Sequence, residues 1–108
     1  MKTQAFVLSL AFAALGAQAD EPVGFQDGMR LVQKYNCQQC HAPYKTLAGP
    51  SFHDIAKHYE SDPHARDEVS TNILDGSAGA WGATPMPAVH VSKADLRPLV
   101  DFILSLSN

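Results

Sequence analysis

Cys37, Cys40 and His41 are the residues of this chain whose types and spacing most directly suggest chemistry. They lie in the stretch CQQCH, and the chain of 108 residues contains no other cysteine. Two thiols three positions apart can form a disulfide, a thiol redox centre, part of a metal site or the attachment point of a cofactor. The imidazole after the second thiol adds a good ligand for a transition metal. The rest of the sequence has to distinguish these four kinds of site.

Three of the four kinds of site are disfavoured. A disulfide between Cys37 and Cys40 would enclose only two residues, so it would constrain the unfolded chain very little. A thioredoxin-like redox pair is expected after a strand of a βαβ unit, and this chain has no convincing strand pattern. A zinc site needs four ligands. The other histidines form no second closely spaced ligand pair; they are His53, His58, His64 and His90.

Covalent attachment of haem is the reading that remains, because C-x-x-C-H is a c-type haem attachment motif. Two thiols three residues apart on a helical turn point to the same side, so each can add to one vinyl group of the same haem. His41 then turns its imidazole towards the iron. The sequence predicts one haem c, attached through two thioether bonds at Cys37 and Cys40.

A second axial ligand is predicted at Met86. Apart from Met1, the chain has only Met29 and Met86, and Met29 suits a core position on a helix. Met86 lies between Pro85 and Pro87 in the stretch WGATPMPAV, where the prolines stiffen the backbone and no helix is expected. A thioether on a rigid loop suits the distal position of a haem, and His/Met ligation raises the haem potential.

The first 19 residues predict a cleaved secretory signal peptide. Lys2 supplies a basic start, residues 5–15 are almost entirely apolar, and Ala17-Gln18-Ala19 resembles a cleavage site. The apolar run is shorter than the ~20 residues that span a bilayer. Residues 20–108 then form one soluble, exported domain in the periplasm, with seven basic against eleven acidic residues and a net charge of −4. This charge argues against nucleic-acid binding and suggests redox partners with a basic patch.

Helices have to position these residues, because the apolar spacing is helical throughout. A helix is predicted over residues 26–36. A second opens after Pro50, with Phe52, Ile55, Ala56 and Tyr59 on one face. A third starts with Asp62 as N-cap and Pro63 as first helical residue, and stops at Gly76.

A long loop, residues 77–91, carries Met86. The last helix begins at a Ser92–Asp95 capping box. Pro98 predicts either a bend in its first turn or a later start, near Leu96.

The chain resembles the small bacterial class I cytochromes c, the short-chain periplasmic group. The resemblance rests on four stretches: CQQCH, AGPSFHDIA, LDGSAGAWGATPMP and LVDFILSL. It implies an all-α fold of four to five helices around one haem, with crossed N- and C-terminal helices that touch at Gly28 and Phe102.

The resemblance also implies roles for further residues. The Pro50 carbonyl should accept a hydrogen bond from His41 Nδ1, and Trp81 should donate to a haem propionate. Phe52 and Ile55 should line the haem. The loop around Pro85 should shield the Met86 sulfur.

Three positions concern the tuning of the site. Asn72 stands where close relatives carry an arginine that pairs with a propionate, and Val89 stands where some carry an asparagine near the ligand sulfur. Losing the cation should lower the reduction potential. His90 lies four residues after Met86 and is expected to replace it as ligand if the loop loosens. The remaining histidines are expected on the solvated surface.

These features predict a one-electron carrier and not an enzyme, because two axial ligands leave the iron no open position. Periplasmic redox proteins would be its partners, bound transiently at the exposed haem edge by a monomer. The alternative is a cytochrome subunit of a larger periplasmic oxidoreductase, such as a sulfite dehydrogenase. An open-site enzyme or gas sensor would require Met86 not to bind the iron.

Overall fold

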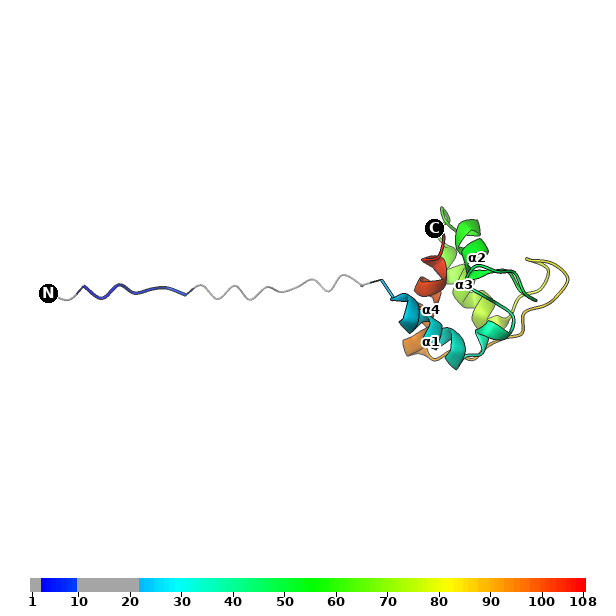
Figure 1. Ribbon diagram of the computed structural model, residues 1–108, viewed down its shortest axis with the longest axis horizontal. Helices are drawn as coiled ribbons and strands as arrows, with labels where there is room; N and C mark the ends of the chain where they lie inside the picture. The colour runs from blue at the N-terminus through cyan, green and yellow to red at the C-terminus, as the bar shows by residue number, and fades with distance from the viewer. Residues whose placement is uncertain (1–2, 10–21) are drawn as a thin grey trace.

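The computed structural model describes residues 3–9 and 22–108, and the ordered body of the chain is helical (Figure 1). Its elements are α1 (Phe25–Lys34), the short 3₁₀ helix η1 (Cys37–Gln39), α2 (Phe52–His58), α3 (Ala65–Asp75) and α4 (Lys93–Leu104). In this described part there is no strand, only two isolated bridges. The predicted all-α class is confirmed. The predicted signal peptide, residues 1–19, lies mostly outside the described residues.

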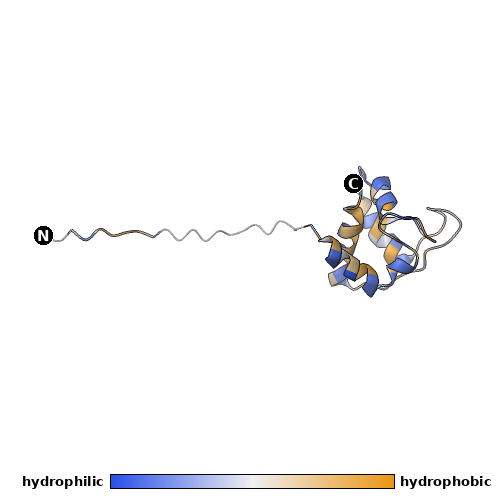
Figure 2. Cartoon of the chain, in the orientation of Figure 1, coloured by the Kyte–Doolittle hydropathy of each residue, from blue (hydrophilic) through white to orange (hydrophobic). Residues whose placement is uncertain are grey.

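Helix α4 is the centre of the packing, since it contacts α1, α2 and α3. Its sequence is the most apolar of the helices, and Figure 2 shows its hydrophobic side turned to the interior. Leu99, Val100 and Phe102 are almost completely buried, together with Val32 of α1 and Phe52 of α2. Burial of this apolar surface is the main stabilising contribution in so small a domain. Among the described residues, no helix combines the length and the hydropathy that a membrane crossing needs.

Helices α1 and α4 meet at the predicted position. A Cβ built on Gly28 would overlap the ring of Phe102, so the absence of a side chain at Gly28 permits this approach. The Phe102 ring also makes edge-on contacts with Phe25 and Phe52, with ring centroids 5.8 Å and 6.5 Å apart. The helix pair that closes the domain therefore packs around one aromatic ring.

The start of α3 differs from the prediction. Asp62 does not cap the helix, which begins at Ala65 with His64 as the N-cap residue. Instead, Asp62 Oδ1 accepts a hydrogen bond from the backbone N–H of His64, at 2.8 Å. Aspartate side chains form such local turns readily, and this turn delays the helix by one or two residues.

Pro98 left two starts possible for α4, one before Pro98 with a bend in the first turn and a later one near Leu96, and the structure has the earlier start. The helix begins at Lys93, and Pro98 lies inside it. The predicted cap is present, with Ser92 Oγ accepting from Asp95 N at 3.2 Å. Pro98 removes the hydrogen bond that the Ala94 carbonyl would accept. Ala94 is exposed, so water can satisfy that carbonyl and the helix can continue.

Candidate cofactor site

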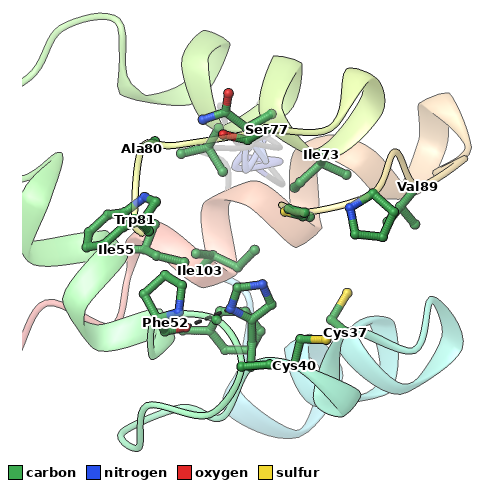
Figure 3. Close-up of a pocket in the computed structure, with 18 of the residues that line it drawn as sticks. Cys37, Cys40, Phe52, Ile55, Ile73, Ser77, Ala80, Trp81, Val89 and Ile103 are labelled. Atoms are coloured by element: carbon green, nitrogen blue, oxygen red, sulfur yellow. Dashed lines mark hydrogen bonds between the residues drawn. The ribbon is translucent and has the colours of Figure 1, made fainter. Parts of the chain in front are cut away.

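One side of the helical body contains an apolar cavity of about 300 Å³. It lies between η1, α2, α3, α4 and the two long loops of the chain (Figure 3). Its size and its apolar walls are typical of a small-molecule site. All eight site residues predicted from the sequence line this cavity: Cys37, Cys40, His41, Pro50, Phe52, Ile55, Trp81 and Met86.

The two cysteines enter the cavity from the turn that follows α1. Asn36 has a left-handed backbone, with φ of 58°, and this reverses the chain before η1. The Cys37 carbonyl then accepts hydrogen bonds from Cys40 N at 3.2 Å and His41 N at 2.9 Å. Figure 3 shows both cysteine side chains at the same edge of the cavity, and both thiols are free. Burial raises the pKa of the Cys37 thiol, whereas Cys40 is exposed.

The ring of His41 is held by three neighbours. Its Nδ1 lies 2.7 Å from the Pro50 carbonyl oxygen. Because a carbonyl can only accept, Nδ1 carries the proton, and a neutral ring then keeps a lone pair on Nε2 for a metal. The ring of Phe52 stacks on the imidazole, with centroids 5.4 Å apart and 21° between the planes. A Cβ built on Gly49 would lie 2.6 Å from His41 Cε1.

Met86 is held at the end of α3. Its N–H and carbonyl both pair with Ser77, at 2.7 Å and 3.0 Å, and Val89 N donates to the Ile73 carbonyl at 2.8 Å. Gly76 makes this approach possible: its φ is +80°, and a Cβ there would lie 2.7 Å from the Met86 carbonyl oxygen. The half-buried thioether lines the cavity together with its neighbours Pro85 and Pro87.

These residues fit a haem c. Two thiols lie at one edge of an apolar cavity, and an imidazole and a thioether reach it from two different loops. This is the donor set of His/Met haem proteins. Among the described residues that line the cavity, none is Asp, Glu, Lys or Arg. The described part of the chain also contains no group of three or more His, Cys, Asp and Glu side chains that could hold a metal ion.

Other residues of the site have contacts that the sequence did not indicate. His53, expected on the solvated surface, is partly buried, and its Nδ1 lies 2.7 Å from the Leu106 carbonyl oxygen. The ring of His58 packs edge-on against Trp81, with centroids 5.0 Å apart. Both partners are far away in the chain, so no local pattern could have revealed them. Trp81 remains 43% exposed, and its bond to a propionate stays a prediction.

Asn72 and Tyr59 both line the cavity. Burial raises the pKa of the Tyr59 hydroxyl, the charge of Glu68 adds to this, and the Asn72 hydrogen bond opposes it. Asn72 is thus an uncharged residue that contacts both the cavity and a core tyrosine. Val89, the other departure from the relatives, also lines the cavity.

A helical body that encloses an apolar cavity, with the C-x-x-C-H segment on one side and a methionine loop on the other, defines a class I cytochrome c. Comparison with known proteins agrees. Residues 25–107 match the family model for Cytochrome c, so the chain belongs to the cytochrome c family. Membership makes it a small electron-transport protein that carries covalently bound haem.

Individual relatives give the same result. The chain is similar to cytochrome c-552 of Nitrosomonas europaea, with 38% identity over 102 residues that cover 94% of this chain and 91% of the relative. It is also 39% identical over 77 residues to cytochrome c-551 of Allochromatium vinosum, covering 70% and 82%. The crystal structure of wild-type Nitrosomonas europaea cytochrome c552 superposes with a TM-score of 0.69 at 40% identity, covering 72% of this chain and 98% of that one.

Proposed function

We propose that this chain is a periplasmic one-electron carrier with a single haem c. Cys37 and Cys40 would hold the haem through two thioether bonds, and the His41 imidazole and the Met86 thioether would bind its iron. The observation that carries this proposal is the meeting of an imidazole, a thioether and two thiols at one apolar cavity. When bound, haem supplies an iron that takes up and releases one electron.

The protein's own residues would orient and shield that iron. The Pro50 carbonyl fixes the tautomer of His41 and makes the imidazole a better electron donor. Phe52 and Ile55 exclude water beside it, and the Ser77 backbone pair holds Met86 in place. Ligands held this firmly keep reorganisation small when the charge changes. With His41 and Met86 both bound to the iron, no position would remain open for a substrate, which favours a carrier over an enzyme.

Partners would approach near Cys40, which is exposed at the edge of the cavity. We propose that they are periplasmic redox proteins that bind a monomer transiently, over a small interface. Isolation from the native periplasm as a single chain would support this proposal. Recovery as a tight complex with a catalytic subunit would replace the carrier by a subunit of a larger oxidoreductase.

Export would place the chain where these partners are, through the signal peptide at residues 1–19. The mass of the protein purified from the periplasm tests this directly. We expect a mature chain that begins at Asp20 and carries the added mass of one haem. A chain that still contains residues 1–19 would contradict the processing.

The optical spectrum tests the ligand set. After acid–acetone extraction the colour should stay with the chain, and the oxidised protein should show a far-red methionine–iron band. Met86→Ala should abolish that band and keep the haem, whereas Met29→Ala should retain both. Haem that extracts would overturn covalent attachment, and a band that survives Met86→Ala would overturn the ligand assignment.

A further inference from the structure

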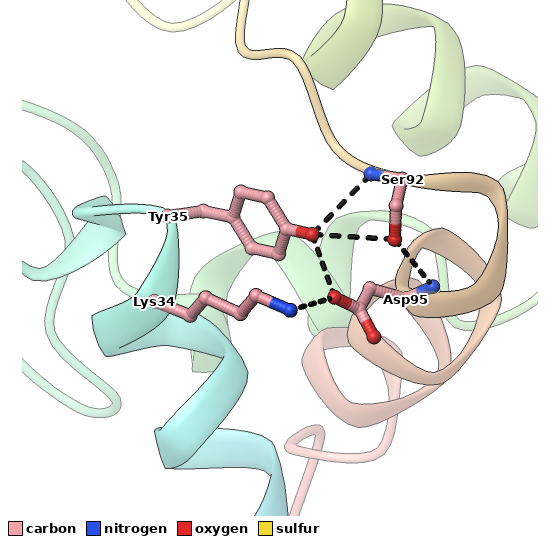
Figure 4. A network of polar contacts seen from close by, with 4 residues as sticks. All are labelled: Lys34, Tyr35, Ser92 and Asp95. Carbon is pink, nitrogen blue, oxygen red and sulfur yellow. Dashed lines mark hydrogen bonds and ion pairs between the residues drawn. The ribbon is translucent and has the colours of Figure 1, made fainter.

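Four side chains form a polar cluster where the end of α1 meets the start of α4 (Figure 4). They are Lys34, Tyr35, Ser92 and Asp95, called here the Tyr35 cluster. Asp95 Oδ2 accepts two short hydrogen bonds, from the Tyr35 hydroxyl at 2.6 Å and from Lys34 Nζ at 2.8 Å. The Tyr35 oxygen also lies 3.3 Å from both the backbone nitrogen and the hydroxyl of Ser92.

The Tyr35 hydroxyl lies between Ser92 and Asp95, the two residues that form the N-terminal cap of α4, and hydrogen-bonds to both. A phenol has one proton to donate, and the short contact assigns it to Asp95. The oxygen then accepts from the Ser92 N–H, the donor that the Asp95 carboxylate would reach in a simple capping box. A residue of α1 therefore completes the N-terminus of α4, and Asp95 points to α1 instead of back to Ser92.

This bridge joins the two sides of the cavity. Tyr35 lies two residues before Cys37 and is among the residues that line the cavity. Ser92 ends the segment that leads away from Met86. The backbone hydrogen bonds that hold Met86 and Val89 go to Ser77, just after α3, and to Ile73, near its end. The Tyr35 cluster thus attaches the segment that follows Met86 to the C-terminal end of α1, just before the cysteines of η1.

We propose that the Tyr35 hydroxyl is a positioning group for Met86: it ties residues 87–92 to α1 and so stabilises the protein against loss of the methionine ligand. The inference rests on the proposed function, in which Met86 binds the iron. It concerns a distinct property, the equilibrium between methionine-bound and methionine-free forms of the folded protein. Loss of the tie would let the segment that carries Met86 and the exposed His90 move away from α1 while the helical core stays intact.

Tyr35→Phe in the haem-loaded protein is the test, because it removes only the hydroxyl. Denaturant titrations at pH 7 would follow the far-red methionine–iron band and, separately, far-UV circular dichroism. We expect the band to be lost at a lower denaturant concentration than in the wild type, ahead of the helical signal. The equilibrium constant for methionine loss should rise roughly five- to tenfold, as expected for one or two hydrogen bonds.

Two controls define the result. Tyr44→Phe removes the hydroxyl of an exposed tyrosine outside the cluster and should leave the band transition unchanged. Arg66→Ala breaks an ion pair between α3 and α4 and should shift both signals together. If Tyr35→Phe also shifts both signals together, Tyr35 has only a structural role and the inference fails. If the wild type itself shows no far-red band, the ligand assignment fails and the inference with it.

Discussion

The space around His41 leaves no room for a further methyl group. Gly49→Ala would place a Cβ within 2.6 Å of His41 Cε1, so the ring or the Pro50 segment must shift. We expect the free energy of unfolding to fall by about 1–3 kcal/mol, the usual cost of overpacking. The haem absorption should shift as well, because the imidazole orientation changes. Denaturant unfolding and the optical spectrum of the purified variant would check both effects.

Gly24→Ala is the matched control for this prediction. The nearest atom to a Cβ at Gly24 is an Asp27 oxygen at 4.0 Å, so the added methyl group meets open space. This variant should keep the wild-type haem spectrum. A Gly49→Ala protein with the same spectrum as Gly24→Ala would mean that Gly49 does not restrict the His41 ring.

His90 lies exposed in the segment that follows Met86. We expect it to replace Met86 as ligand when that segment loosens at raised pH or in mild denaturant. His90→Ala should then move the loss of the far-red band to higher pH, since the competing ligand is gone. A pH titration of the oxidised wild type and variant compares the two midpoints, and equal midpoints would exclude His90.

At the residue scale, the sequence predicted the groups that are recognised by type and spacing, such as Cys37 and Met86. The hydrogen bond between His41 and Pro50 was expected only through resemblance to relatives, and the structure contains it. The role of Tyr35 in the polar cluster could not be predicted. Its partners lie nearly sixty positions away in the chain, and no sequence motif marks a tyrosine at this position. A polar cluster between helix ends becomes visible only when the helices are placed in space.

Among the elements, the contact of α1 with α4 depends on Gly28. Gly28→Ala gains about 1 kcal/mol of helix propensity, but the new Cβ overlaps the buried Phe102 ring. Overpacking of a core costs about 1–3 kcal/mol. Because this cost exceeds the gain in helix propensity, we expect a net loss of stability of up to about 2 kcal/mol. Thermal and denaturant unfolding would measure it.

A double-mutant cycle gives the control for this contact. Phe102→Leu shortens the facing side chain and leaves room for the new Cβ. Gly28→Ala should therefore lower the free energy of unfolding less in the Phe102→Leu background than in the wild type. Such non-additivity is expected for two residues in contact. An equal cost in both backgrounds would assign the effect to the helix backbone.

The predicted elements were correct in kind and order, and the errors lay at their ends. The buried face of α4 contains Leu99, Phe102 and Ile103, whose spacing is helical. The start of α3 was misplaced because Asp62 can form either a cap or a local turn, and one sequence does not separate the two. Pro98 left two starts open for the last helix, since the sequence does not show that the freed carbonyl is exposed to water.

For the whole molecule, the Lys34–Asp95 pair predicts a pH dependence of stability. Hydrogen bonds from Lys34 and Tyr35 hold the pKa of Asp95 below its ordinary 3.8. The hydrogen bond to Asp95 and its negative charge raise the pKa of Lys34 above its ordinary 10.5. The contribution of Asp95 is therefore present above its unfolded pKa and lost as the pH falls through the lower, folded value. The contribution of Lys34 is lost at the alkaline end, as the pH rises through its raised value.

Asp95→Asn tests the acidic side of this dependence. The variant should be less stable than the wild type at pH 7, and the difference should shrink as the pH falls below about 4. Urea unfolding of both proteins at several pH values would give the difference between their free energies of unfolding. Effects of acid on other groups are the same in both proteins and cancel in this difference. A difference that stays constant with pH would contradict the role of the charged pair.

Net charge does not show where the charged side chains lie relative to the site. The composition suggests partners with a basic patch, but none of the described residues that line the cavity is a charged Asp, Glu, Lys or Arg. The acidic and basic side chains lie on other parts of the helices, many of them in pairs such as Arg30–Asp27 and Lys57–Glu60. Composition counts charges without their positions, so this separation could be known only from the fold.

The backbone pair between Ser77 and Met86 closes the base of the long loop, and the residues between these two form its tip. Gly79 and Gly82 in the tip have open space where a side chain would begin, whereas Gly76 at the base is tightly enclosed. Doubling the length of such a tip costs only about 0.6 kcal/mol of closure entropy. Insertions after Gly82 should therefore cost little stability and leave the Ser77–Met86 pair, and with it the position of the thioether, unchanged.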